Sequence, residues 1–155
     1  MALRSNNNKE KLKISRKIKI EKELCSGCSI CELACSLYHE GVCRPEWSRI
    51  RIDKKFLLLE YNPQLCIQCD WPACYYECPT DAIKIDPNTG TRYIVDDECI
   101  GCGKCVKVCP LIPDLKIIGY KKIGKKKVYF KCDLCRDRTD GPLCVEMCPR
   151  NVLSY

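Results

Sequence analysis

The sequence predicts a small α+β fold in which short helices and short β-hairpins are organised around bound metal. Three observations support this prediction. The 155 residues include 17 cysteines, about 11% of the chain and far above ordinary usage. Sixteen of them fall into four quartets of similar spacing. Without the cysteines the apolar fraction drops from 46% to about 35%, so side-chain burial alone would hold the fold weakly.

The four quartets form an internal repeat. The third reads CIGCGKCVKVCP, with gaps of two, two and three residues and a closing proline. The first has the same gaps but ends in Ser36, and the second and fourth widen the middle gap to four and eight residues. The quartets are Cys25, Cys28, Cys31 and Cys35; Cys66, Cys69, Cys74 and Cys78; Cys99, Cys102, Cys105 and Cys109; and Cys132, Cys135, Cys144 and Cys148. Cys43 is left over and is expected to be a loop thiol, not a ligand.

This spacing is typical of the bacterial run that holds a cubane iron–sulfur cluster. Three thiolates within seven residues wrap one face of the inorganic core, and the fourth lies past a helical turn that the proline ends. Zinc ribbons, built from paired CxxC units, are the alternative, but the asymmetric ending of the quartets favours iron and sulfide. A disulfide scaffold would need export, and the first twenty residues are polar and basic with no apolar signal segment. We therefore expect metal-bound thiolates in a reducing cytoplasm.

The remaining segments predict short elements in chain order. Residues 1–13 are expected to form a mobile basic tail, and the isoleucines between Ile14 and Leu24 predict a strand. A hairpin turning at Asp53–Lys55, a second around Pro87–Gly90 and a third near Gly124 separate the quartets. NVLSY ends the chain as a short strand. The apolar run FLLL is too short to span a bilayer, so no membrane insertion is expected.

The formal charge of +7 would suggest a polyanionic partner if the cysteines were neutral. Four thiolates around a cubane core of charge 2+ leave roughly −2, so four clusters bring the total to about −1. No nucleic-acid partner is therefore expected. The lysines between Lys121 and Lys127 are predicted to form a solvated turn, with docking to an acidic partner as the alternative.

From Cys25 to Pro149 the chain resembles the four-cluster ferredoxin subunits of the dimethyl sulfoxide reductase type, which carry electrons for molybdenum and tungsten enzymes, hydrogenases and related complexes. CSGCSICELACSLYHEG followed by SRIRI is most similar to the small subunits that serve tungsten aldehyde oxidoreductase-type enzymes, including benzoyl-coenzyme A reductase complexes. The resemblance implies two bacterial dicluster-ferredoxin-like modules, an outer one over 14–62 plus 113–155 and an inserted one over 63–112.

The resemblance also implies a ligand set for each of four [4Fe-4S] clusters, because quartets one and four pair, as do two and three. The sets are Cys25, Cys28, Cys31 and Cys148; Cys132, Cys135, Cys144 and Cys35; Cys66, Cys69, Cys74 and Cys109; and Cys99, Cys102, Cys105 and Cys78. Ser36 in place of proline should leave ligation unaffected.

The sequence contains no histidine cluster, no glycine-rich phosphate loop and no nucleophile beside a base, so a non-catalytic electron carrier is expected. His39, the only histidine, is predicted to lie at the surface or in a loop, with a hydrogen bond near a cluster as the alternative. The expected partner is a catalytic tungsten or molybdenum subunit in an anaerobic complex, with a flavin or other redox subunit as a possible third component. The alternatives are that the chain serves a hydrogenase or a formate or carbon monoxide dehydrogenase, or that it is a free carrier. A zinc-binding interaction module is a remote one.

Overall fold

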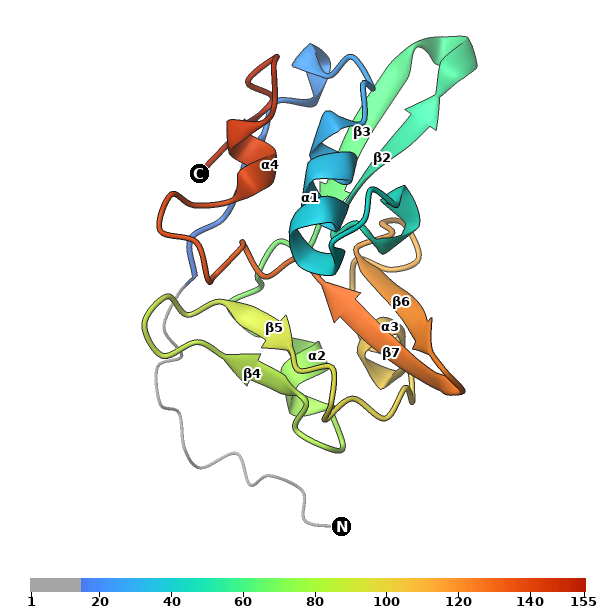
Figure 1. Cartoon of the computed structure of the whole chain (residues 1–155), viewed down its shortest axis with the longest axis vertical. Helices are drawn as coiled ribbons and strands as arrows, with labels where there is room; N and C mark the ends of the chain where they lie inside the picture. Colours follow the sequence, from blue (N-terminus) through green and yellow to red (C-terminus); the bar gives the residue numbers. More distant parts are fainter. Residues whose placement is uncertain (1–14) are drawn as a thin grey trace.

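A computed structural model describes residues 15–155 (Figure 1). The predicted tail over 1–13 lies outside the described residues. Within residues 15–155 the chain forms four small antiparallel sheets, each of two strands, and four α-helices. The helices are α1 (Ile30–Glu40), α2 (Ala73–Tyr76), α3 (Lys104–Lys107) and α4 (Leu143–Glu146). The paired strands are β1 (Lys19–Ile20) with β8 (Leu153–Ser154), β2 (Ile50–Lys55) with β3 (Glu60–Leu65), β4 (Ile83–Ile85) with β5 (Arg92–Ile94), and β6 (Ile118–Ile123) with β7 (Lys126–Lys131).

This is the small mixed fold of short helices and hairpins that the sequence predicts, with two local differences. The first strand covers only Lys19–Ile20, because β8 offers just two residues to pair with, and a 3₁₀ turn follows at Lys22–Leu24. The first hairpin turns at Phe56–Leu58, not at Asp53–Lys55. Its register places buried Ile50 opposite buried Leu65, and this keeps the pairing regular as far as Lys55.

The elements gather at two ends of the molecule. In Figure 1, α1, α4, the β2–β3 hairpin and the pairing of the chain ends occupy the upper half. The β4–β5 hairpin, α2, α3 and the β6–β7 hairpin occupy the lower half. Val128 and Tyr129 of β7 share a buried cluster with Ala82 and Cys99. The last hairpin therefore packs against the segment that the sequence assigns to the inserted module.

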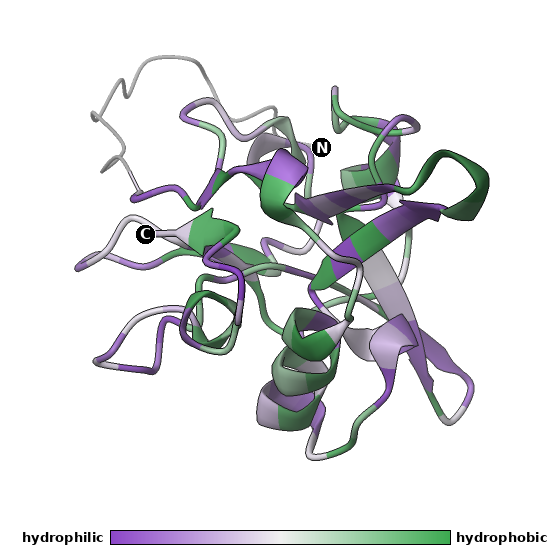
Figure 2. Cartoon of the chain, turned by 90° about the horizontal axis from the view of Figure 1, so that it is seen from above, coloured by the Kyte–Doolittle hydropathy of each residue, from purple (hydrophilic) through white to green (hydrophobic). Residues whose placement is uncertain are grey.

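Cysteines make up about a third of the buried hydrophobic residues between 15 and 155. One buried cluster combines four cysteines with a few aliphatic residues such as Ile50, Leu65 and Val152. The FLLL run lies on the surface at the tip of β2–β3, where Leu57 is 100% exposed. Figure 2 shows this apolar tip at the far end of the hairpin. No helix within residues 15–155 is long and apolar enough to cross a membrane.

Helix α1 is longer than the other three because Ser36 replaces the closing proline. Pro79, Pro110 and Pro149 follow soon after the four-residue helices, whereas α1 continues to Glu40 and ends at Gly41 with a φ of 71°. Ser36 Oγ donates a hydrogen bond to the Leu33 carbonyl and accepts one from the Arg44 backbone N–H, both at 3.0 Å.

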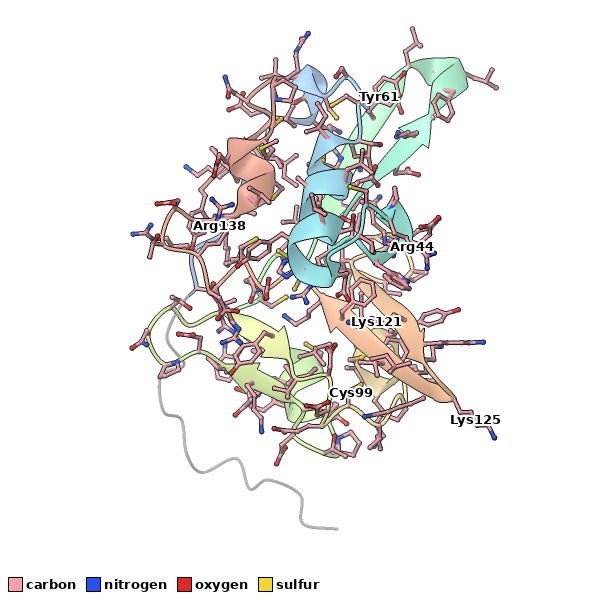
Figure 3. All side chains as sticks on the ribbon, viewed as in Figure 1. Arg44, Tyr61, Cys99, Lys121, Lys125 and Arg138 are labelled. Atoms are coloured by element: carbon pink, nitrogen blue, oxygen red, sulfur yellow. The ribbon has the colours of Figure 1, made fainter. Side chains whose placement is uncertain are left out.

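The added helical turn carries Glu40 to the β6–β7 hairpin. Lys121 Nζ lies 2.6 Å from Glu40 Oε2 and 2.9 Å from Asp96 Oδ2, and only 12% of its side chain is exposed. The prediction of a solvated turn is therefore wrong for Lys121, although Lys125 at the tip is exposed (Figure 3).

Candidate iron–sulfur site

The loop between the first two cysteines of each quartet has one backbone feature in common. The residue before the second cysteine has a positive φ in all four loops: Gly27 (70°), Gln68 (53°), Gly101 (72°) and Leu134 (56°). This left-handed conformation costs a non-glycine residue about 1–2 kcal/mol, so Gln68 and Leu134 are held in it by their surroundings. The tight turn brings both flanking cysteines to one side of the loop.

A helix places the third and fourth cysteines of each quartet. The third lies in the helix. The fourth also lies in the helix in α1, where side chains four residues apart share one face, and lies two residues past the end of the helix in the other three quartets. Cys74 and Cys78 line two different cavities, one with Cys66 and Cys69, the other with Cys99 and Cys102.

The cysteines come together in four groups, which we call sites A to D. Site A is a cavity lined by Cys25, Cys28, Cys31 and Cys148. Site C is lined by Cys66, Cys69, Cys74 and Cys109, and site D by Cys78, Cys99, Cys102 and Cys105. Site B comprises Cys35, Cys132, Cys135 and Cys144, all of them buried.

The pKa shifts of the site B cysteines show that these cysteines lie close to one another. Burial, followed by the charges of Cys35 and Cys135, raises the pKa of Cys144. Burial, followed by the charge of Cys144, raises the pKa of Cys132. Cys35, Cys132, Cys135 and Cys144 therefore lie close together, and the assignment of each of the four groups to one cluster stays a prediction.

Contacts between the cysteines connect site A with site B, site B with site C and site C with site D. Cys31 of site A and Cys35 of site B are neighbours on α1 and share one buried cluster. Cys66 of site C packs against that same cluster. Burial, followed by the charge of Cys74 in site C, raises the pKa of Cys105 in site D to about 12.

The two ends of the row differ from its middle in exposure. Figure 3 shows Tyr61, whose ring lies against Gly27 of the site A loop, far from Cys99 of site D. Cys28 in site A and Cys102 in site D are exposed, whereas sites B and C contain no exposed cysteine.

The thiols of these sites need a positive partner to ionise. Burial, reinforced by nearby charged groups, raises the pKa of Cys31 to about 12, and burial raises the pKa of Cys74 and of Cys135 to about 11. Such thiols stay protonated at neutral pH unless a cationic core displaces the protons.

Backbone amides point at several of the sulfurs. Arg49 N lies 3.3 Å from Cys35 Sγ, Leu134 N lies 3.4 Å from Cys132 Sγ, and Val152 N lies 3.4 Å from Cys148 Sγ. Hydrogen bonds of this kind stabilise the charge on sulfur and set the reduction potential of a bound cluster.

His39 belongs to site B. Its Nε2 lies 3.8 Å from Cys135 Sγ and 3.4 Å from Asp133 Oδ1, and its side chain is only 7% exposed. Burial and then the charge of Arg49 lower the pKa of His39 to about 4, so the ring is neutral at pH 7. The prediction of a surface or loop histidine is wrong, and the alternative of a contact near the cysteines agrees with the structure. The extra turn of α1 that Ser36 permits is the sequence signal for this position.

Two basic residues at site C could not be found from the sequence. Arg92 and Lys131 line its cavity and are 1% and 2% exposed. Lys131 Nζ donates a hydrogen bond to the Arg92 carbonyl and lies 3.6 Å from Cys66 Sγ. The Nε, Nη1 and Nη2 atoms of Arg92 have no hydrogen-bond partner among residues 15–155.

The residues present fit an anionic, thiolate-bound metal core. Each site offers four sulfur donors, the donor set of a [4Fe-4S] cluster. At site C the unpartnered guanidinium is the group expected beside a negative charge, since a buried cation without one is strongly unfavourable. Cys43 is exposed and lines none of the cavities that contain the other cysteines.

Comparison with known families assigns the chain to a class. Residues 57–155 match the 4Fe-4S dicluster domain, and residues 22–38 match a 4Fe-4S binding domain. The chain therefore belongs to the 4Fe-4S dicluster ferredoxin-like family.

Its relatives include named electron-transport subunits. The chain is 42% identical over 133 residues to the polyferredoxin-like subunit of an aliphatic sulfonate oxidoreductase from Pyrococcus furiosus, covering 84% of this chain and 70% of the relative. It is 32% identical over 143 residues to the electron transport protein HydN of Escherichia coli, covering 83% and 81%. A chain of the active site complex BamBC of benzoyl coenzyme A reductase aligns with a TM-score of 0.50 at 26% identity, covering 88% of this chain and 76% of that one. The protein is thus an iron–sulfur electron-transfer subunit, and the names of its relatives are consistent with a non-catalytic carrier.

Proposed function

We propose that sites A to D each hold one [4Fe-4S] cluster and that the chain conducts single electrons along the row between an exposed end at site A and an exposed end at site D. The observation that supports this proposal is the exposure of Cys28 in site A and of Cys102 in site D, whereas sites B and C contain no exposed cysteine. Each cluster would supply one-electron transfer at a potential set by charge, hydrogen bonds to sulfur and exposure. Four cysteines would ligate each cluster and would leave no iron free for substrate chemistry.

Within this proposal, sites A and B belong to the outer module over 14–62 plus 113–155, and sites C and D to the inserted module over 63–112. The exchange of the fourth cysteine ties the two sites of each module together. Cys148 and Cys35 are exchanged between A and B, and Cys109 and Cys78 between C and D.

The proposed partner is a catalytic oxidoreductase subunit, with a tungsten or molybdenum enzyme as the first candidate. The support comes from the first quartet and its flanking residues, which resemble small subunits of tungsten aldehyde oxidoreductase-type enzymes. It also comes from relatives named as part of a sulfonate oxidoreductase and of a benzoyl coenzyme A reductase complex. A role with a hydrogenase, or as a free carrier, is the second candidate, since the relative HydN is named as an electron transport protein.

Metal analysis of the anaerobically purified protein tests the cluster count. We expect about 16 iron and 16 sulfide per chain if all four sites are filled. Cys102→Ala, at site D, should lower the iron content by up to one cluster, while Cys43→Ser, at an exposed loop thiol, should leave it unchanged. A colourless protein that contains zinc and no sulfide would refute the proposal in favour of a zinc module.

Affinity purification from the native host tests the partner. Tungsten or molybdenum in stoichiometric amounts with a co-purifying large subunit is the expected result. Recovery of the chain alone, with its full iron content, would favour the free carrier.

A further inference from the structure

Site C differs from the other three sites in the charge that surrounds it. Arg92 and Lys131 are both buried and both line its cavity. A buried charge costs several kcal/mol unless an opposite charge compensates it. Since arginine does not lose its proton in proteins, the guanidinium needs an anion close by.

No side chain in the described part of the chain provides that anion. The three guanidinium nitrogens of Arg92 have no hydrogen-bond partner. Neither Arg92 nor Lys131 forms an ion pair with any carboxylate among residues 15–155. The negative charge that remains for them is the one on the four thiolates and their core.

At site B the nearby charges are balanced within the protein. Arg49 Nη1 lies 2.7 Å from Asp133 Oδ2, so the cation is paired with a buried carboxylate. The same carboxylate faces His39, whose Nε2 lies 3.4 Å from Asp133 Oδ1.

At the two end sites the cations are exposed. The cavity of site A is lined by exposed Arg150 and that of site D by exposed Lys104, and solvent screens both charges. Buried Glu32, next to Cys31, adds a negative charge near site A. Site C alone among the four therefore faces buried cations that no carboxylate balances.

The position of Arg92 is fixed by the loop of site C itself. Gln68, between Cys66 and Cys69, accepts a hydrogen bond from Arg92 N at 2.8 Å and donates one to Arg92 O at 3.2 Å. The same amide donates to the Cys132 carbonyl at 2.7 Å, which joins the loops of sites B and C.

We propose that Arg92 and Lys131 give site C the highest reduction potential of the four sites, so that an electron rests there between its arrival and its departure. This inference rests on the proposed function. When site C is reduced, it gains one electron and one negative charge from the neighbouring centre, which is oxidised. Fixed cations in a medium of low dielectric constant stabilise that added charge. No proton has to accompany the electron, since the two cations already provide the compensating charge.

A reductive titration of the full chain with dithionite, followed by electron paramagnetic resonance, tests the proposal. In Arg92→Met and in Lys131→Met, the reduction equilibrium constant of the most easily reduced centre should fall at least tenfold, which is 59 mV for one electron. Arg92→Lys keeps the charge and should change it less than threefold. Lys125→Met, at the exposed tip of the β6–β7 hairpin (Figure 3), is the matched control. It should also change the reduction equilibrium constant less than threefold.

A second pair of variants locates the first-reduced centre without altering either cation. Cys69→Ser changes a ligand of site C and should alter the signal that appears at the highest potential, whereas Cys28→Ser, at site A, should leave that signal as it is. Cys69→Ser and Cys28→Ser also test the proposal if Arg92→Met and Lys131→Met fail to fold or to take up iron and sulfide.

Two results would overturn the inference. One is an unchanged highest potential in methionine variants that keep their iron and sulfide, and the other is a highest-potential signal that responds to Cys28→Ser. Either result would leave the proposed electron-transfer function standing, because that function fails only if the wild-type chain lacks the clusters.

Discussion

Ser36→Pro tests whether the long helix α1 is a stabilising element that is independent of cluster ligation. The change restores the residue that closes the other three quartets. Proline inside a helix removes one backbone hydrogen bond and clashes with the preceding turn, at a cost of about 3 kcal/mol. It also removes the hydroxyl that accepts the Arg44 N–H.

The loss extends to the last turn of the helix. His39 and Glu40 reach site B and the β6–β7 hairpin only because α1 continues, and the contact of Glu40 with Lys121 at 2.6 Å would be broken. We expect a total loss of about 3–5 kcal/mol, a large part of the typical stability of a domain. The iron content should stay the same, because α2, α3 and α4 hold their cysteines with a proline in this place.

Anaerobic unfolding in guanidinium chloride, followed by visible absorbance and circular dichroism, measures the effect. With a slope of about 3–4 kcal/mol per molar, the midpoint should fall by about 1 M. Ser36→Ala is the matched control, since it keeps the helix and should cost only about 1 kcal/mol. Equal midpoints for the two variants would refute a stabilising role for the extension. Loss of iron from Ser36→Pro would refute its independence from ligation.

Two further predictions concern the cysteine loops. Gly101→Ala should destabilise the protein by more than 2 kcal/mol and deplete iron, because an added Cβ would lie 2.3 Å from the carbonyl oxygen of Lys127. Gly124→Ala has a similar positive φ but nothing within 4 Å, so it should cost only about 1 kcal/mol in the same denaturant assay, and equal effects would argue against the clash. Gln68→Leu should cost about 2–4 kcal/mol, since it leaves the buried Cys132 carbonyl and the Arg92 N–H without partners. A thermal-unfolding midpoint within 2 °C of wild type would contradict that expectation.

The repeat made much of the fold predictable. The spacing of the cysteines predicts local turns, and the alternation of apolar and polar residues around Ile83–Ile85 and Lys126–Lys131 predicts hairpins. Both kinds of element could therefore be expected at about the right places. The extent of the first strand could not, because it depends on how many residues the far end of the chain offers for pairing.

The cysteine groups and their surroundings differ in how far the sequence reveals them. The grouping required knowledge of how related proteins exchange their fourth cysteine, since spacing alone leaves several pairings open. Arg92 and Lys131 lie on strands with ordinary sequences, and only tertiary packing buries them beside Cys66. His39 was misplaced because the substitution at Ser36 was treated as neutral, although it lengthens the helix that carries the histidine.

The pairing of β1 with β8 has a consequence for the order in which the protein matures. Site A takes three cysteines from near the start of the chain and Cys148 from near its end, and the strands that close this part include residues 153 and 154. The cysteines of sites C and D, in contrast, all come from one continuous segment, from Cys66 to Cys109. During synthesis the cysteines of sites C and D are all available once Cys109 has been made, whereas sites A and B need cysteines as late as Cys148. Iron and sulfide delivery should therefore proceed from sites C and D to sites A and B, and a chain truncated after β7 should keep sites C and D intact.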